Sequence, residues 1–122
     1  MKKKEILIYH NPRCSKSREA LSLLEAENCT LTVKEYLKTP ISKKELKDLL
    51  MKLGISASDL VRKKEKLFLE KFKNKNFTED EWQQILIENP VLIERPMVVD
   101  GYKAIVGRPP ELVLDLLKRK SN

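Results

Sequence analysis

Cys14 occupies a position where a thiol becomes reactive. It follows a short apolar run, residues 6–9, and precedes a segment with helical spacing that begins at Ser15. A cysteine at a junction of this kind faces free backbone N–H groups and the positive end of a helix, which favour the thiolate. The same N–H groups can hold an oxyanion. The sequence therefore predicts that Cys14 is a nucleophile beside an anion pocket.

The immediate neighbours of Cys14 fit this chemistry. Arg13 and Arg18 flank the cysteine, and nearby cations lower the pKa of a thiol. Ser15 and Ser17 carry hydroxyl groups that can serve as further donors. The sequence predicts that the nucleophile, the anion pocket and the orienting groups lie within a few residues of one another.

Two other side chains could take part in thiol or proton chemistry. Cys29 follows the predicted helix, lies at its negative end and has no basic neighbours, so we interpret it as structural. A Cys14–Cys29 disulfide is not expected, because a helix of ~12 residues spans ~18 Å and bridged Cα atoms lie within ~7 Å. His10, the one histidine, either orients the loop, acts on protons or is a loop histidine with a hydrogen-bond partner.

The segments on either side of Cys14 are predicted to form a β-α-β unit. Residues 6–9 are rich in strand formers, residues 15–27 have apolar side chains at helical spacing, and Leu31 and Val33 supply a second strand. Strands joined by a helix run parallel with a right-handed crossover.

The middle of the chain, about residues 40–90, is predicted to be a helical insertion. Residues 42–45 and 78–81 both match the capping box that starts a helix, and Gly54 is expected to end the first of these helices. One or two short helices are expected within residues 56–72.

The last part of the chain returns to strands. Residues 97–99 and 104–106 flank Asp100-Gly101, a dipeptide typical of a tight hairpin, and a helix is expected over about residues 109–118. The predicted order is β-α-β, helices, β-β-α, an α/β fold within a single domain of residues 1–122.

Composition limits the classes of function. The net charge is +7, and 19 of the 25 basic residues are lysines spread along helical segments, as on a solvated surface. Two cysteines do not form a disulfide framework, which favours the cytoplasm. The sequence has no apolar run of ~20 residues and no metal-ligand spacing, so neither a membrane partner nor a metal is expected.

The arginines are placed differently from the lysines. Five of them lie beside prolines, cysteine or predicted helix ends: Arg13, Arg18, Arg62, Arg95 and Arg108.

Four short motifs occur in a specific order along nearly the whole chain. They are His10-Asn-Pro-Arg-Cys14 followed by Ser17-Arg18, then Arg62, then Glu94-Arg-Pro96, and finally Gly107-Arg-Pro109. In this order the chain resembles the glutaredoxin-coupled arsenate reductase family. The resemblance implies a thioredoxin-like fold with a helical insertion and favours a monomer.

The resemblance also implies roles for individual residues. Cys14 matches the family nucleophile, and Pro96 matches the cis-proline that lies against its loop. Three residues match the anion-binding arginines: Arg62, Arg95 and Arg108. Three more match supporting positions of the thiol loop: His10, Ser17 and Arg18. Guanidinium groups suit this task because they present fixed donor forks and stay charged.

The implied reaction is the reduction of arsenate to arsenite through a thioarsenate on Cys14. Because Ser17 occupies the position of a second cysteine, the intermediate needs an external thiol, which the resemblance identifies as glutathione followed by glutaredoxin. No bound cofactor is implied. The residues Ser15-Lys16 differ from the smaller, glycine-containing pair of typical members.

Two alternatives remain open on the sequence. One is a glutathione-linked thiol oxidoreductase that acts on another substrate. The other is a regulator similar to the Spx type, which shares the fold and binds RNA polymerase. Those regulators carry Cys-x-x-Cys and lack the Gly-Arg-Pro arginine, so Ser17 and Arg108 favour the reductase branch, and neither nucleic acid nor RNA polymerase is expected as a partner.

Overall fold

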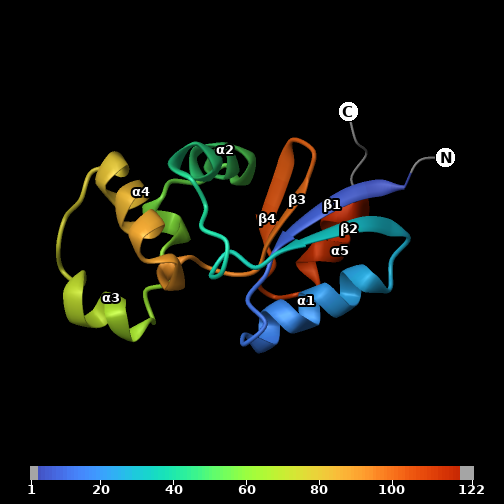
Figure 1. Cartoon of the computed structure of the whole chain (residues 1–122), viewed down its shortest axis with the longest axis horizontal. Helices are drawn as coiled ribbons and strands as arrows, with labels where there is room; N and C mark the ends of the chain where they lie inside the picture. The colour runs from blue at the N-terminus through green and yellow to red at the C-terminus, as the bar shows by residue number, and fades with distance from the viewer. Residues whose placement is uncertain (1–2, 119–122) are drawn as a thin grey trace. The chain divides into compact units, whose positions relative to one another are not determined.

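The strand and helix predicted on either side of Cys14 are both present in the computed structural model, which describes residues 3–118 (Figure 1). The chain divides into two units: one contains the residues up to Thr39 and those from Arg95 onward, and the other is Pro40–Glu94. The organisation as a single domain of residues 1–122 with an insertion at about 40–90 stays a prediction.

The first unit begins with the expected β-α-β arrangement. Strand β1 is Lys4–Tyr9, helix α1 is Ser15–Glu25 and strand β2 is Cys29–Lys34. The two strands are parallel, with Ile6 opposite Leu31. The helix ends two residues earlier than predicted, where the N–H of Ala26 donates to the carbonyl oxygen of Ser22.

A hairpin and a helix complete this unit. Strand β3 is Met97–Asp100, strand β4 is Lys103–Val106 and helix α5 is Leu112–Lys118. Asp100 pairs with Lys103, so the two loop residues are Gly101 and Tyr102, one position later than Asp100-Gly101. Gly101 has φ of +61°, which a residue without Cβ adopts readily.

Helix α5 starts three residues later than predicted. The residue before a proline is disfavoured in a helix, and Pro109 precedes Pro110. The chain instead makes a turn in which the N–H of Leu112 donates to the carbonyl oxygen of Pro109. This turn separates β4 from α5.

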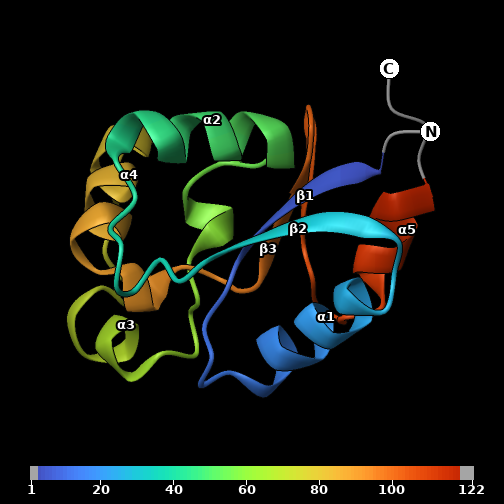
Figure 2. The ribbon, with the colours of Figure 1, turned by 45° about the vertical axis from the view of Figure 1, so that its right-hand side comes forward.

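Within residues 3–118 the sheet has four strands in the order β2-β1-β3-β4, and α1 and α5 pack against it (Figure 2). Alternate residues of a strand point to one face, and residues four apart on a helix share a side. The core between helices and sheet consists of seven buried side chains: Ile6, Ile8, Ala20, Leu24, Val98, Val113 and Leu116. This core fixes the start of α1, and therefore Cys14, against the sheet.

The second unit is helical. Its elements are α2 (Lys43–Leu53), the 3-10 helix η1 (Ser58–Leu60), α3 (Lys66–Lys71), α4 (Glu79–Glu88) and the 3-10 helix η2 (Pro90–Leu92). The prediction of short helices within residues 56–72 is confirmed. No helix of the described residues is long and apolar enough to span a membrane.

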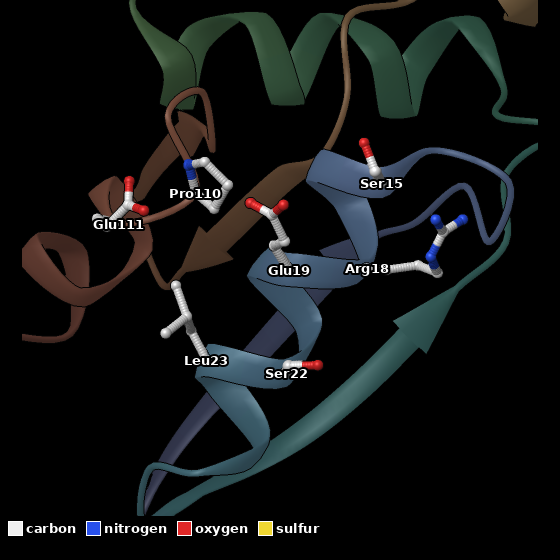
Figure 3. A pocket seen from close by; sticks show the side chains of 7 residues that line it. All are labelled: Ser15, Arg18, Glu19, Ser22, Leu23, Pro110 and Glu111. Carbon is white, nitrogen blue, oxygen red and sulfur yellow. The ribbon is translucent and has the colours of Figure 1, made fainter.

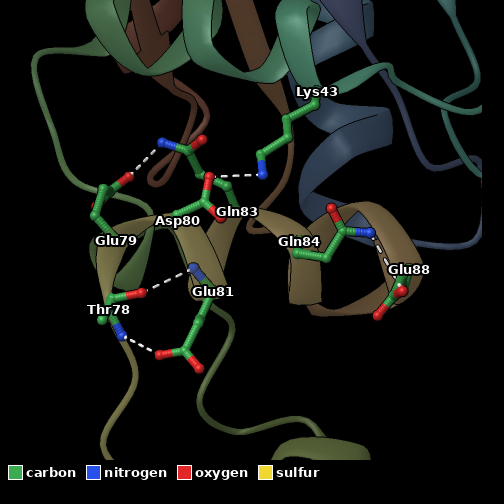
Figure 4. A network of polar contacts seen from close by, with 8 residues as sticks. All are labelled: Lys43, Thr78, Glu79, Asp80, Glu81, Gln83, Gln84 and Glu88. Atoms are coloured by element: carbon green, nitrogen blue, oxygen red, sulfur yellow. Dashed lines mark hydrogen bonds and ion pairs between the residues drawn. The ribbon is translucent and has the colours of Figure 1, made fainter.

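Both predicted helix entrances in this unit are confirmed. Thr78 Oγ1 accepts from the N–H of Glu81 at 3.2 Å, and Glu81 Oε1 accepts from the N–H of Thr78 at 2.9 Å (Figure 4). At the start of α2, Ser42 Oγ accepts from the N–H of Glu45 at 3.1 Å. Gly54 ends α2 with φ of +70°.

Replacing Thr78 with alanine should destabilise the protein by about 1 kcal/mol, because one N–H at the start of α4 loses its acceptor. Urea unfolding would measure the change. Thr78→Ser, which keeps the hydroxyl group, is the matched control and should lie close to wild type. Equal stability of the alanine variant and wild type would contradict the role of the capping box.

Candidate thiol site

Cys14 is the N-cap residue of α1. Its backbone is extended, with φ of −96° and ψ of 121°, and its carbonyl oxygen accepts from the N–H of Arg18 at 3.0 Å. The Cys14 thiol does not form a side-chain capping hydrogen bond. The backbone N–H groups of Lys16 and Ser17 nevertheless stabilise negative charge on Sγ. The predicted position of Cys14 at the start of a helix is therefore confirmed, and its role as a nucleophile stays a prediction.

Two arginines from the far end of the first unit act on the thiol. Arg108 Nη2 lies 3.4 Å from Cys14 Sγ, and Arg108 Nε donates to the backbone carbonyl oxygen of Arg95 at 2.7 Å. The buried Arg95 side chain also hydrogen-bonds the thiol. The Arg95 carbonyl oxygen orients the planar Arg108 guanidinium through Nε. As a result, Nη2 of the same guanidinium faces the Cys14 sulfur.

The pKa of Cys14 is lowered from its ordinary value. Burial alone raises the pKa, but the N–H of Ser17, the side chain of Arg95, the N–H of Lys16 and the charge of Arg108 together outweigh it. The site therefore stabilises the thiolate of Cys14 more than an ordinary cysteine side chain is stabilised in water.

The flanking arginines act differently from the prediction. Arg13 and Arg18 are both exposed, and Arg18 Nη1 donates to the carbonyl oxygen of Pro12 at 2.9 Å. The cations that lower the pKa of Cys14 are Arg95 and Arg108, which are distant in sequence. Proximity along the chain was a poor guide here, because Arg13 lies in the loop before the helix and the Arg18 guanidinium bonds the Pro12 carbonyl oxygen.

His10 and Ser17 hold the loop in front of the helix. Both are buried, and His10 Nδ1 lies 2.7 Å from Ser17 Oγ. Burial lowers the pKa of His10, more strongly than the charge of Glu35 raises it, so the ring is neutral at pH 7. The Ser17 hydroxyl also accepts from the N–H of Asn11 at 3.0 Å. The Ser17 hydroxyl therefore stabilises the loop, whereas the sequence predicted that it would donate a hydrogen bond to a bound anion.

Asn11 is a site residue that sequence reasoning missed. Its side-chain Oδ1 accepts from the N–H of Arg13 at 3.0 Å, and its backbone carbonyl oxygen accepts from the N–H of Cys14 at 3.0 Å. Asparagine commonly bonds the backbone two residues further on in turns, and this pattern was the available signal.

The Gly107-Arg-Pro109 motif brings Arg108 close to Pro96. The Arg95–Pro96 peptide bond is cis, as the resemblance implies, and the N–H of Gly107 donates to the carbonyl oxygen of Pro96 at 2.8 Å. A Cβ atom at Gly107 would lie 3.1 Å from Pro96 Cγ and 3.1 Å from Val113 Cγ1. The absence of a side chain at this position therefore permits the close approach.

Arg62 belongs to the second unit. Its N–H donates to the carbonyl oxygen of Leu92 at 2.6 Å. Its guanidinium forms ion pairs with Glu65, at 3.4 Å, and with Glu94, at 3.8 Å. The structure brings Arg95 and Arg108 to Cys14, whereas a role of Arg62 in the same site stays a prediction.

Cys29 differs from Cys14 in the direction in which its surroundings shift the pKa. Both cysteines are free, which confirms that they do not form a disulfide. Burial and the charge of Glu27 raise the pKa of Cys29, and its Sγ donates to the carbonyl oxygen of Leu24 at 3.5 Å. Its half-buried side chain packs against the core, in agreement with a structural role.

The arrangement at Cys14 combines a thiol of lowered pKa, two guanidinium groups and helix N–H groups. Such a set attacks an electrophilic centre and at the same time stabilises a negatively charged oxygen next to it. Residues 3–118 contain no group of three or more His, Cys, Asp or Glu side chains placed to hold a metal ion.

Replacing Arg108 with glutamine should raise the pKa of Cys14, because the charge nearest the sulfur is lost. The pH dependence of alkylation by iodoacetamide, measured in a Cys29→Ser background, would report this pKa. Arg18→Gln removes an equal charge at the neighbouring loop and is the control, for which no comparable rise is expected. An unchanged pKa in Arg108→Gln would show that the arginine does not act on the thiolate.

Comparisons with known proteins show which family this chain is similar to. The model of the ArsC family matches residues 9–116. An arsenate reductase of Neisseria meningitidis serogroup A is 48% identical over 109 residues, covering 88% of this chain and 93% of that protein. The uncharacterized protein YfgD of Escherichia coli K12 is 47% identical over 116 residues, covering 93% of this chain and 98% of that protein.

The solved structure of an arsenate reductase from Vibrio cholerae matches with a TM-score of 0.87 and 43% identity, over 93% of this chain and 98% of that one. The predicted thioredoxin-like α/β fold, with the element order β-α-β, helices, β-β-α, is therefore confirmed. Because the family model covers almost the entire chain and the relatives align over most of their length, this protein belongs to the ArsC family.

Proposed function

We propose that this protein is an arsenate reductase in which the Cys14 thiolate is the nucleophile. The observation that carries the proposal is the contact of 3.4 Å between Arg108 Nη2 and Cys14 Sγ, with Arg95 bonded to the same thiol. A thiolate surrounded by guanidinium groups suits a tetrahedral oxyanion, because the cations offset the charge that the anion brings to the nucleophile. Relatives named arsenate reductase are 38–48% identical over most of this chain.

In the first step the Cys14 sulfur attacks arsenic. A sulfur–arsenic bond forms, one arsenic–oxygen bond breaks, and the departing oxygen takes up a proton and leaves as water. Arsenic remains As(V) in the thioarsenate. Arg95 and Arg108 hold the oxygens of the ester, and we include Arg62 as the third anion-binding arginine because its position in the motif order matches that role.

In the second step an external thiol releases the product. Its sulfur attacks Cys14 Sγ, a disulfide forms, and the sulfur–arsenic bond breaks with its electron pair on arsenic, which becomes As(III) and leaves as arsenite after protonation. The two sulfurs supply the two electrons. Glutathione is the external thiol that we propose, and glutaredoxin then reduces the mixed disulfide. These thiols place the reaction in the cytoplasm.

Replacing Cys14 with serine should reduce arsenite formation to the uncatalysed background, because an alcohol is a far poorer nucleophile than a thiolate at neutral pH. Arsenite production with glutathione, glutaredoxin and NADPH would be measured. Cys29→Ser is the matched control and should retain activity. Arsenite formation by Cys14→Ser at the wild-type rate would refute the proposal.

The role of Arg62 can be tested separately from the thiol. Arg62→Gln should raise KM for arsenate by about tenfold or more, as expected for the loss of a charged hydrogen bond to an oxyanion, and should leave the pKa of Cys14 unchanged. Steady-state kinetics and thiol titration measure the two effects. A wild-type KM would exclude Arg62 from the arsenate site.

A further inference from the structure

The second unit contains a pocket of about 620 Å³ whose lining residues all lie within residues 47–83. It is found where α2 ends and α4 begins, and the loop after α2 and the helix η1 complete its wall. The volume falls within the range of about 300–1,000 Å³ that is usual for small-molecule sites. None of the lining residues takes part in the reaction proposed for Cys14.

Gln83 places a buried acceptor without a donor in the wall of this pocket. Gln83 is 8% exposed, and its Nε2 donates to Glu79 Oε2 at 2.7 Å (Figure 4). Gln83 Oε1 is buried and receives no hydrogen bond within residues 3–118. A buried polar atom without a partner costs free energy, so a donor that reaches Oε1 is stabilised there.

The bond to Glu79 also fixes which end of the Gln83 amide is available. If the amide were flipped, Oε1 would face the Glu79 carboxylate, and two acceptors would be in contact. The terminal torsion of a glutamine side chain is broad, so a modest rotation exposes Oε1 to a ligand in the pocket at little cost. Gln83 therefore selects a ligand that donates a hydrogen bond.

Two carboxylates are held against successive backbone N–H groups in the same wall. Glu79 Oε1 accepts from the N–H of Ala57 at 3.0 Å, and Asp59 Oδ2 accepts from the N–H of Ser56 at 3.3 Å. The Ser56 hydroxyl also donates to Asp59 Oδ2, at 2.9 Å. Both bonds from Ser56 go to Oδ2, so Asp59 keeps Oδ1 for a further donor.

The charge around the pocket is negative, although the chain as a whole carries +7. Helix α2 has 11 residues and ends next to the pocket, where the negative end of its dipole adds to the carboxylates of Asp59 and Glu79. Lys47 is the one cation among the lining residues. Its charge acts on Asp80, outside the pocket, where it adds to the larger effect of Lys43 in lowering the pKa of that carboxyl.

A pocket beside α1 in the first unit lacks this convergence. Arg18 extends from one side of α1, whereas Glu19 and Glu111 lie toward the other side (Figure 3). These charges are of opposite sign and do not select one ligand group. In the second unit the two carboxylates and the Gln83 oxygen all select a donor with positive charge.

The remaining lining side chains supply an apolar surface beside the acceptors. Leu50, Met51 and Ile55 belong to it, and Met51 is 80% exposed. Methionine is flexible and adapts to an apolar group of variable shape. A matching ligand therefore has a cationic head and an aliphatic part.

We propose that this pocket binds a small aliphatic amine in its ammonium form. The ammonium group donates to Gln83 Oε1 and to the carboxylates of Asp59 and Glu79, and the alkyl chain covers Met51 and Ile55. An ammonium group suits these acceptors because it has three donors and no acceptor. The site is independent of the thiol chemistry of the first unit.

Three probes with the same five-carbon chain test the proposal on the full-length protein. They are n-pentylammonium, neutral n-pentanol and anionic pentanoate. The amide NMR signals of the Gln83 side chain and of the Ala57 backbone are followed during each titration, at about 0.15 M salt to screen distant charges. We expect n-pentylammonium to shift both signals saturably, with a Kd on the order of 1 mM, and the other two probes to bind at least about tenfold more weakly.

Two variants assign the binding to named acceptors. Gln83→Met keeps a side chain of similar length, lacks the acceptor and should raise the Kd of n-pentylammonium about tenfold or more. Asp59→Asn changes an exposed side chain that still accepts from Ser56, and it should raise the Kd about threefold. Asp48→Asn is the matched control, because it removes an exposed carboxylate from α2 that pairs with Lys52 outside the pocket, and its Kd should equal that of wild type.

Three results would overturn the proposal. Equal binding of n-pentanol and n-pentylammonium would show that only the apolar surface binds. Saturable binding of pentanoate in preference to the amine would assign the pocket to anions held by Lys47. A wild-type Kd in both Gln83→Met and Asp59→Asn would exclude the acceptors on which the site is built.

Discussion

The contact between Arg108 and Cys14 is the interaction on which the site depends. Arg108 donates through Nε to the carbonyl oxygen of Arg95 and through Nη2 to the sulfur, so one planar group connects two distant segments of the chain. Burial alone would raise the pKa of Cys14, and the guanidinium groups together with the helix N–H groups outweigh it, so that the pKa is lowered. The reactivity of the thiol therefore depends on the tertiary structure of the first unit.

The fold positions Arg108 next to Cys14 through close packing between separate segments of the first unit. The parallel pairing of β1 with β2 and the core under the sheet fix the start of α1. On the other side, Gly107 lies directly against Pro96 and Val113, at a separation that a larger residue would disturb. Within the thiol loop, the buried pair His10 and Ser17 holds the backbone in position for Cys14. Neutral His10 supports the loop without adding a charge next to the thiolate.

Much of the fold could be predicted from local signals. Residue type and spacing identified the capping residue Thr78, the helix-ending Gly54, and the strand, helix and second strand around Cys14. The errors were at boundaries, such as the start of α5, where two prolines delay the helix. The position of Cys14 at the start of a helix could also be predicted, because a strand-to-helix junction is a local feature, whereas its role as a nucleophile stays a prediction.

The side chains that act on Cys14 could not be predicted in the same way. Arg13 and Arg18 were the nearest cations in sequence, but the charges that act on the sulfur come from Arg95 and Arg108, and only the resemblance to a family pointed to them. The roles of Asn11 and of the Ser17 hydroxyl likewise depend on how the loop folds back on itself. Such contacts between separate segments have no periodicity that a single sequence reveals.

The most direct test of the account is a titration of the Cys14 thiol in the Cys29→Ser protein, with and without arsenate. We predict that alkylation of Cys14 follows a pKa below that of an ordinary cysteine and that arsenate protects the thiol at neutral pH. An ordinary thiol pKa, together with an alkylation rate that saturating arsenate leaves unchanged, would contradict the claim that Cys14 is a thiolate prepared for an oxyanion.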